Sequence, residues 1–86
     1  MPCISQFYGI AVYIYYRDHP PPHFHAFYGD SEAIVEIETG AIIEGSLPRR
    51  ASKLIAEWSS LHRAELIVDW ELAESLQPLV PIDPLD

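Results

Sequence analysis

The sequence predicts an α+β fold, in which a four-stranded antiparallel meander sheet is followed by two C-terminal helices packed on one of its faces. Up to Glu44, β-branched and aromatic residues recur with the period of two that is typical of strands, whereas from Ser46 onward apolar residues recur with a period of 3.6. The connections between the expected strands are short. Short connections favour antiparallel neighbours, because parallel pairing needs a longer crossover.

Four segments have strand character. Residues 7–17, FYGIAVYIYYR, are apolar on both faces and are expected to form the central strand, with a bulge or a close backbone approach at Gly9. Shorter strands are expected over 23–28, 32–38 and 41–44. The side chains expected to face the core are Tyr8, Ile10, Val12, Ile14, Ala33, Val35 and Ile37.

Helices are expected over about 48–61 and 63–75, because their two apolar stripes are out of phase and imply a break or bend near 59–62. The tail, 77–86, has a proline at every third position, which favours an extended segment that packs on its own domain or on a partner. With 86 residues the chain is too short to divide, so residues 1–86 are expected to form a single domain.

The composition excludes several classes of protein. The chain has no long apolar run and no signal-peptide pattern, which predicts a soluble protein that stays in the cytoplasm. A single cysteine, Cys3, cannot form an internal disulfide, and this fits a reducing compartment. The formal net charge of −8 disfavours general DNA binding, which depends on clustered basic residues.

The segment 18–26, DHPPPHFHA, is chemically unusual because it combines three prolines with the histidines His19, His23 and His25. On a strand, His23 and His25 project from the same face. Neutral imidazole is a common ligand of zinc, and Asp18 can either join the ligands or orient one ring. Asp18, His19, His23 and His25 are therefore candidate metal ligands, and the three histidines are also candidate acid–base groups.

Two alternatives remain open for this segment. In the first, the histidines simply hydrogen-bond and stiffen a loop, and the protein needs no cofactor. In the second, they bind a divalent metal such as zinc or transfer protons. Clusters of titratable groups occur at functional sites more often than expected by chance, which supports this alternative.

A second group of residues is basic. Arg49, Arg50 and Lys53 follow Gly45-Ser46-Leu47-Pro48 and stand at the start of the first expected helix, where the helix dipole disfavours positive charge. They are candidates for binding a partner or an anion, with Arg50 as a candidate phosphate clamp. The alternative is that they pair with exposed glutamates of the sheet, namely Glu36, Glu38 and Glu44.

The motifs DHPPPHFHA and EGSLPRR, together with EWSSLHRAELIVDW, resemble the DUF4160 family of small bacterial proteins of unknown function. The resemblance implies a place in compact two-gene modules of the toxin–antitoxin type, beside a second small protein of the DUF2442 type. The positions that carry it are Asp18, His19, Pro21, Pro22, His23, Phe24, His25, Ala26, Gly45, Leu47, Pro48, Arg50, Trp58, His62 and Trp70.

Three functional hypotheses follow. The first is an acidic protein-interaction module that binds a small cognate protein, in keeping with the resemblance. The second is a metal-dependent or His/Arg-dependent phosphodiesterase or RNase-like effector that uses His19, His23, His25 and Arg50. The third is self-association through a sheet edge or the tail. The sequence leaves open whether the chain is an enzyme.

Overall fold

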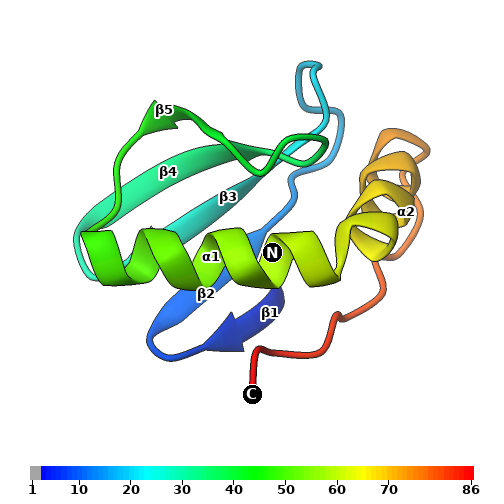
Figure 1. Cartoon of the computed structure of the whole chain (residues 1–86). Coiled ribbons are helices and arrows are strands. Elements are labelled where there is room, and N and C mark those ends of the chain that lie inside the picture. Colours follow the sequence, from blue (N-terminus) through cyan, green and yellow to red (C-terminus); the bar gives the residue numbers. More distant parts are fainter. Residues whose placement is uncertain (1–2) are drawn as a thin grey trace.

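The computed structural model of the chain describes residues 3–86 and has an antiparallel sheet with two helices (Figure 1). The α+β class and the antiparallel meander are confirmed, but the sheet has five strands in the order β1-β2-β3-β4-β5, so the expected number of four is wrong. The elements are β1 Cys3–Phe7, β2 Ile10–Tyr13, β3 His23–Tyr28, β4 Ser31–Glu36, β5 Ile42–Gly45, α1 Arg49–Leu61 and α2 Arg63–Glu74.

The additional strand arises because the expected strand 7–17 is divided by a tight turn. Tyr8 and Gly9 have φ values of 50° and 82°, and two consecutive residues with positive φ make the two-residue turn that suits a hairpin. Phe7 consequently pairs with Ile10. Gly9 therefore belongs to a hairpin turn rather than to a bulge, Tyr8 is exposed rather than in the core, and the central strand is β3.

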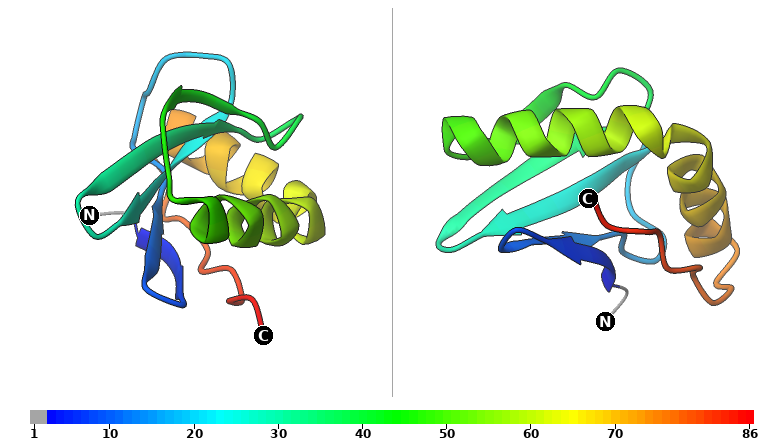
Figure 2. Two further views of the ribbon diagram at one scale, coloured as in Figure 1. Left: turned by 60° about the vertical axis from the view of Figure 1, so that its left-hand side comes forward. Right: turned by 60° about the horizontal axis from the view of Figure 1, so that its bottom comes forward.

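The core lies between α1 and the face of the sheet that α1 crosses (Figures 1 and 2). Its largest side chain is Trp58, which is fully buried and contacts the rings of Phe7 and Phe24 at centroid distances of 5.3 and 5.7 Å. Burying aromatic rings of this size contributes strongly to stability. Because side chains alternate along β3, Phe24 faces this core while His23 and His25 face the other way.

The two helices meet at His62, which is the C-cap of α1 and the N-cap of α2. Its backbone N–H makes the last hydrogen bond of α1, to the carbonyl oxygen of Trp58. The tail then packs on its own domain, which resolves the alternative that the sequence left open. Three hydrogen bonds hold it: Val80 N–H to Asp69 Oδ1 at 2.8 Å, Ile82 N–H to Ile4 O at 2.8 Å, and Trp58 Nε1–H to Asp83 O at 2.9 Å.

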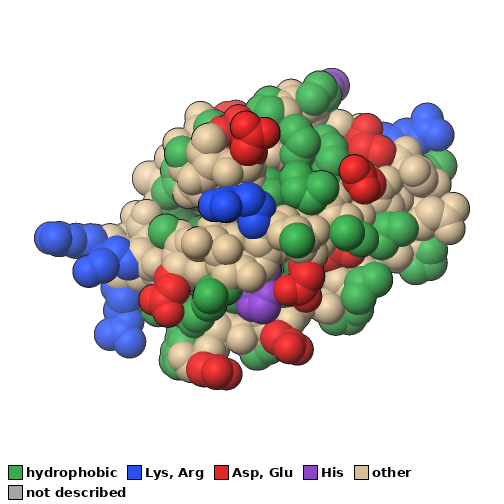
Figure 3. Space-filling view, turned by 45° about the vertical axis from the view of Figure 1, so that its right-hand side comes forward, with side chains coloured by type: hydrophobic (Ala, Val, Ile, Leu, Met, Phe, Trp, Pro, Cys, Tyr) green, Lys and Arg blue, Asp and Glu red, His purple; other side chains and the backbone are tan. Residues whose placement is uncertain are grey.

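The surface is unevenly charged. Figure 3 shows acidic side chains spread over the face that it presents, whereas basic side chains gather mainly at one end, where α1 begins. Within residues 3–86, no helix combines the length and the apolar character needed to cross a bilayer.

Candidate functional site

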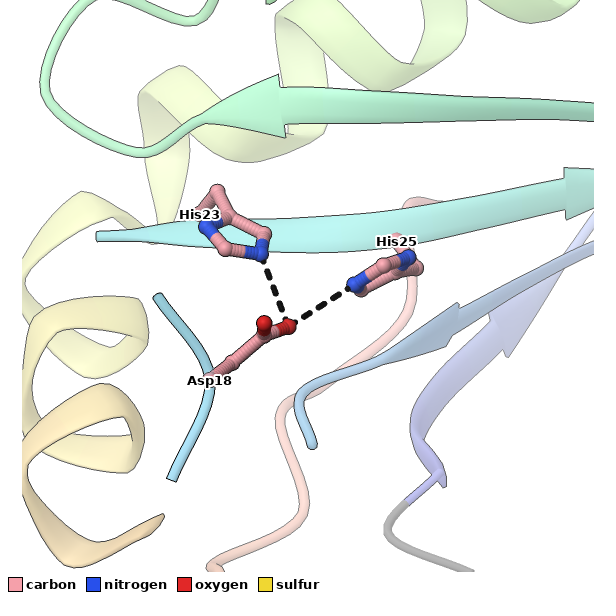
Figure 4. Close-up of side chains that lie close together, drawn as sticks. All are labelled: Asp18, His23 and His25. Carbon is pink, nitrogen blue, oxygen red and sulfur yellow. Dashed lines mark hydrogen bonds and ion pairs between the residues drawn. The ribbon is translucent and has the colours of Figure 1, made fainter. Parts of the chain in front are cut away.

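Asp18, His23 and His25 come together where the loop after β2 meets the first residues of β3. His23 and His25 are two positions apart on β3 and therefore project from the same face. Asp18 lies in the loop, directly after Arg17, whose φ is 51°. The loop returns to β3 through three consecutive prolines, with a cis peptide bond between Pro20 and Pro21. This return places the Asp18 carboxylate opposite both rings (Figure 4).

One carboxylate oxygen contacts both histidines. Oδ2 of Asp18 lies 2.9 Å from Nε2 of His23 and 3.1 Å from Nε2 of His25. One potential ligand atom from each of the three residues lies within 4.8 Å of the others. We refer to Asp18, His23 and His25 as the triad.

The other ring nitrogens of the triad are held by groups outside it. Nδ1 of His23 lies 2.8 Å from the carbonyl oxygen of Pro21, and Nδ1 of His25 lies 3.3 Å from Oε2 of Glu32. A carbonyl oxygen can only accept a hydrogen bond, so Nδ1 of His23 carries a hydrogen and donates it to Pro21. Both ring nitrogens of His25 face carboxylates, so a neutral His25 ring can donate to only one of them. In a neutral His23 ring the lone pair then resides on Nε2 and faces Asp18, whereas a protonated ring donates to Asp18 from Nε2.

Aromatic rings fix the orientation of the two imidazoles. Trp70 of α2 contacts His23 at a centroid distance of 5.1 Å, and Tyr15 contacts His25 at 4.6 Å. The His23 side chain is only 8% exposed, whereas the Asp18 side chain is 23% exposed. The triad is thus rigid on the side of α2 and open to solvent near Asp18.

The electrostatics favour a charged Asp18. Burial alone would raise the pKa of Asp18, but hydrogen bonds from His25, from the backbone N–H of His19 and from His23 outweigh burial and lower it. Beside the triad, burial and the neighbouring carboxylates of Glu32 and Asp18, together with Tyr13, raise the pKa of the Tyr15 hydroxyl above its ordinary value.

The triad fits a metal ion because it brings three electron-pair donors to one point. With neutral imidazoles, Nε2 of His23 would face the ionised carboxylate of Asp18 with its lone pair, and His25 could donate to only one of its two carboxylate neighbours, unless positive charge lies between these groups. Two additional protons can supply that charge, and so can one divalent cation. Two histidines and one carboxylate are a recurring ligand set of catalytic zinc and of non-haem iron, and an Nδ1–H held by a carbonyl or a carboxylate is typical of ligating histidines.

The structure separates the remaining candidate residues from the triad. The ring of His19 is exposed and is not among the potential ligands, although its backbone N–H donates to Oδ1 of Asp18 at 2.8 Å. His62 lies between the helices, where its Nδ1 is 2.6 Å from Oε1 of Glu65.

The basic residues Arg49, Arg50 and Lys53 stand at the other end of the molecule from the triad. α1 begins far from α2 in Figure 1, and Trp70 of α2 is the residue that packs on His23. A helix of 13 residues spans about 20 Å. Arg50 therefore cannot clamp a substrate that is bound at the triad, and the histidine and arginine groups are two separate features.

Two of the residues that surround the triad, Tyr15 and Glu32, were not predicted from the sequence as site residues. Glu32 and Tyr15 lie within segments that the sequence predicts as strands, and no motif marks either of them. The outward direction of Glu32 and of His25 was readable from alternation. Their proximity depends on the register of β3 with β4, in which His25 pairs with Ile34, and short strands do not encode this register in their composition.

Comparison with known proteins gives a family but no activity. A family model described as a domain of unknown function, DUF4160, matches residues 9–71. The matched region contains the triad, Glu32, Trp70 and the basic start of α1, and it leaves β1 and the tail outside. No curated protein and no solved structure matches the chain.

Proposed function

The chain belongs to the DUF4160 family, and from this premise we propose that it is a metal-dependent hydrolase whose centre is the triad of Asp18, His23 and His25. The ion proposed is a divalent transition metal, with Zn²⁺ as the first candidate. The proposal follows the second of the functional hypotheses that the sequence suggested, without its arginine clamp.

The observation that carries this proposal is the opposed orientation of the two ring nitrogens in each histidine. Each Nδ1 is held by an oxygen outside the triad, at Pro21 and at Glu32, and each Nε2 faces Oδ2 of Asp18. A loop that only needed stiffening could use a single histidine contact to Asp18. Three electron-pair donors around one point, with Nδ1 of each ring held by an oxygen outside the triad, suit a cation.

The number of ligands favours a catalytic role over a structural one. Structural zinc sites are closed by four protein ligands, whereas catalytic sites use three and leave a position open. Within residues 3–86 the triad is the only group of three or more potential ligands. When bound, such an ion polarises a substrate oxygen or lowers the pKa of a water molecule. Partly exposed Asp18 marks the side from which a substrate reaches the centre.

The chain's own residues would assist this chemistry by position. Glu32 holds the ring of His25, and Trp70 packs on the ring of His23, so both Nε2 atoms keep their direction. Tyr15 lies against His25 and keeps its hydroxyl proton, because its pKa is raised. A protonated phenol beside the centre is available as a hydrogen-bond donor to a bound substrate.

The test is hydrolysis of two chromogenic probes by zinc-loaded protein. Bis(p-nitrophenyl) phosphate represents phosphodiesters and p-nitrophenyl acetate represents carboxylic esters. We expect turnover of at least one probe, its loss in His25→Ala and in chelator-treated protein, and its retention in His19→Ala. If a zinc-loaded, folded protein turns over neither probe above the rate of free zinc, the hydrolytic function is wrong.

The interaction role that the sequence suggested is a separate proposal, and the observation that favours it is the basic start of α1, which is treated in the next subsection. The pairing with a second small protein of the DUF2442 type remains a prediction. Co-expression followed by size-exclusion chromatography measures that pairing directly.

A further inference from the structure

We propose that Arg49, Arg50 and Lys53, the basic cluster, form a docking surface for an acidic segment of a partner protein. The three side chains line one surface groove together with Leu54 and Glu57. This surface is separate from the triad, so the inference does not depend on the metal centre.

The basic cluster is an isolated positive region on an acidic molecule. It contains three of the five basic residues of the chain, whereas of the 13 acidic residues only Glu57 lines the same groove. Figure 3 shows the basic side chains that project from the end where α1 begins, away from most of the acidic ones. An acidic partner is attracted to this positive end and repelled by the acidic remainder of the molecule, so charge directs such a partner to the basic cluster.

The charges of the basic cluster are unpaired. The four ion pairs formed by the described part of the chain all involve histidine, so no carboxylate lies within 4.0 Å of Arg49, Arg50 or Lys53. The glutamates Glu36, Glu38 and Glu44 therefore do not pair with them, contrary to the alternative that the sequence left open. Arg63 differs, because it donates to the carbonyl oxygen of Ile37. The donors of the basic cluster remain free for a ligand.

The start of α1 adds to the positive potential of the basic cluster. Pro48 stands at the N-cap and provides no side-chain acceptor, and the first turn contains no acidic residue. The first backbone N–H groups of the helix therefore lack the carboxylate or hydroxyl oxygen that usually accepts their hydrogen bonds. Carboxylates of a bound segment would accept from these groups and from the two guanidinium groups together.

An acidic protein segment fits this groove better than a nucleic acid does. Affinity for nucleic acid grows with the number of phosphates that are neutralised, and the basic cluster offers three cations with Glu57 beside them. Leu54 is partly buried against the core and lines the same groove, so it provides an apolar contact. A peptide that alternates acidic and apolar side chains matches both features.

The test uses a fluorescein-labelled peptide of alternating Glu and Leu, followed by fluorescence anisotropy. We expect saturable binding that weakens as salt is added, and at least about tenfold weaker binding by the double variant Arg49→Glu/Arg50→Glu. Arg17→Glu is the control for a change of charge outside the basic cluster. It is matched to the single variant Arg50→Glu, which makes the same change of charge inside the cluster, and it should bind as the unmodified protein does. A Gln and Leu peptide should not bind.

Three results would overturn the inference. The first is the absence of saturable binding, or binding that the double variant retains. The second is tighter binding of a single-stranded RNA of equal charge, with amide chemical-shift changes at Arg49, Arg50 and Lys53, which would assign the groove to nucleic acid. The third is self-association that the double variant abolishes, which would assign it to a second copy of this chain.

Discussion

Nε2 of His23 lies 2.9 Å from Oδ2 of Asp18, five residues earlier, and this contact joins the loop after β2 to the first residue of β3. The same oxygen reaches His25 at 3.1 Å. Because Nδ1 of each ring is already committed to another oxygen, the shared oxygen of Asp18 marks the point where positive charge is needed. The functional account follows from this relationship.

Glu32→Ala should weaken zinc binding by about 10-fold to 100-fold, because Glu32 holds the ring of His25 without contacting the metal position. Isothermal titration calorimetry measures this change. Glu44→Ala is the matched control, since Glu44 is another glutamate of the sheet and its change should leave zinc affinity unchanged. An equal loss of zinc affinity in Glu32→Ala and Glu44→Ala would indicate a general effect of charge, and would contradict the orienting role of Glu32.

Asp69→Asn should change how stability depends on pH. Asp69 is 1% exposed, its Oδ2 has no hydrogen-bond partner among residues 3–86, and burial raises its pKa, with Glu65 adding to the rise and the N–H of Val80 opposing it. A carboxyl whose pKa is raised on folding stabilises the fold below its unfolded pKa, and this stability is lost as the pH rises through the folded pKa.

Between about pH 4 and the raised pKa, the unfolding free energy of the wild type should therefore fall relative to Asp69→Asn, by at most about 1.4 kcal/mol per pH unit. Urea unfolding at several pH values, followed by tryptophan fluorescence, measures this difference. Asp30→Asn in an exposed turn is the control. If the unfolding free energies of wild type and Asp69→Asn changed in parallel with pH, the pKa of Asp69 would be the same in the folded and unfolded states, and the prediction would be wrong.

Gly45→Ala should destabilise the protein by about 3 kcal/mol, because φ is +77° and a Cβ atom would lie 2.3 Å from the carbonyl oxygen of Glu32. Gly29→Ala is a matched control, since its φ is +57° but nothing lies within 4 Å of the added atom. We expect Gly29→Ala to destabilise the protein by only about 1 kcal/mol. Urea unfolding compares the two, and similar losses would mean that backbone conformation alone, rather than contact with β4, decides the effect.

Much of the fold could be predicted because the spacing of apolar residues along the chain indicates which side chains are buried. The break between the helices within residues 59–62 and the core positions of Val12, Val35 and Trp58 all follow from apolar spacing. The hairpin at Tyr8 and Gly9 could not be read in this way, because apolar residues continue on both sides of it and the turn depends on positive φ values at both residues.

The candidate site was predicted in part. Asp18, His23 and His25 were among the residues named, and the shared face of the two histidines follows from strand alternation. The exclusion of His19 depends on the path of the proline loop. The distance between Arg50 and the triad depends on the direction in which α1 crosses the sheet. Neither is encoded in local sequence patterns, because both are set by long-range packing.

The most direct test of the metal centre is a zinc titration of the untagged protein by isothermal titration calorimetry, with Asp18→Ala, His25→Ala and His19→Ala beside the wild type. The account predicts one zinc ion per chain, at least about tenfold weaker binding in Asp18→Ala and His25→Ala, and unchanged binding in His19→Ala. Circular dichroism confirms that each variant is folded. A folded wild-type protein without saturable zinc binding, or a folded His25→Ala that binds as tightly as the wild type, would contradict the account.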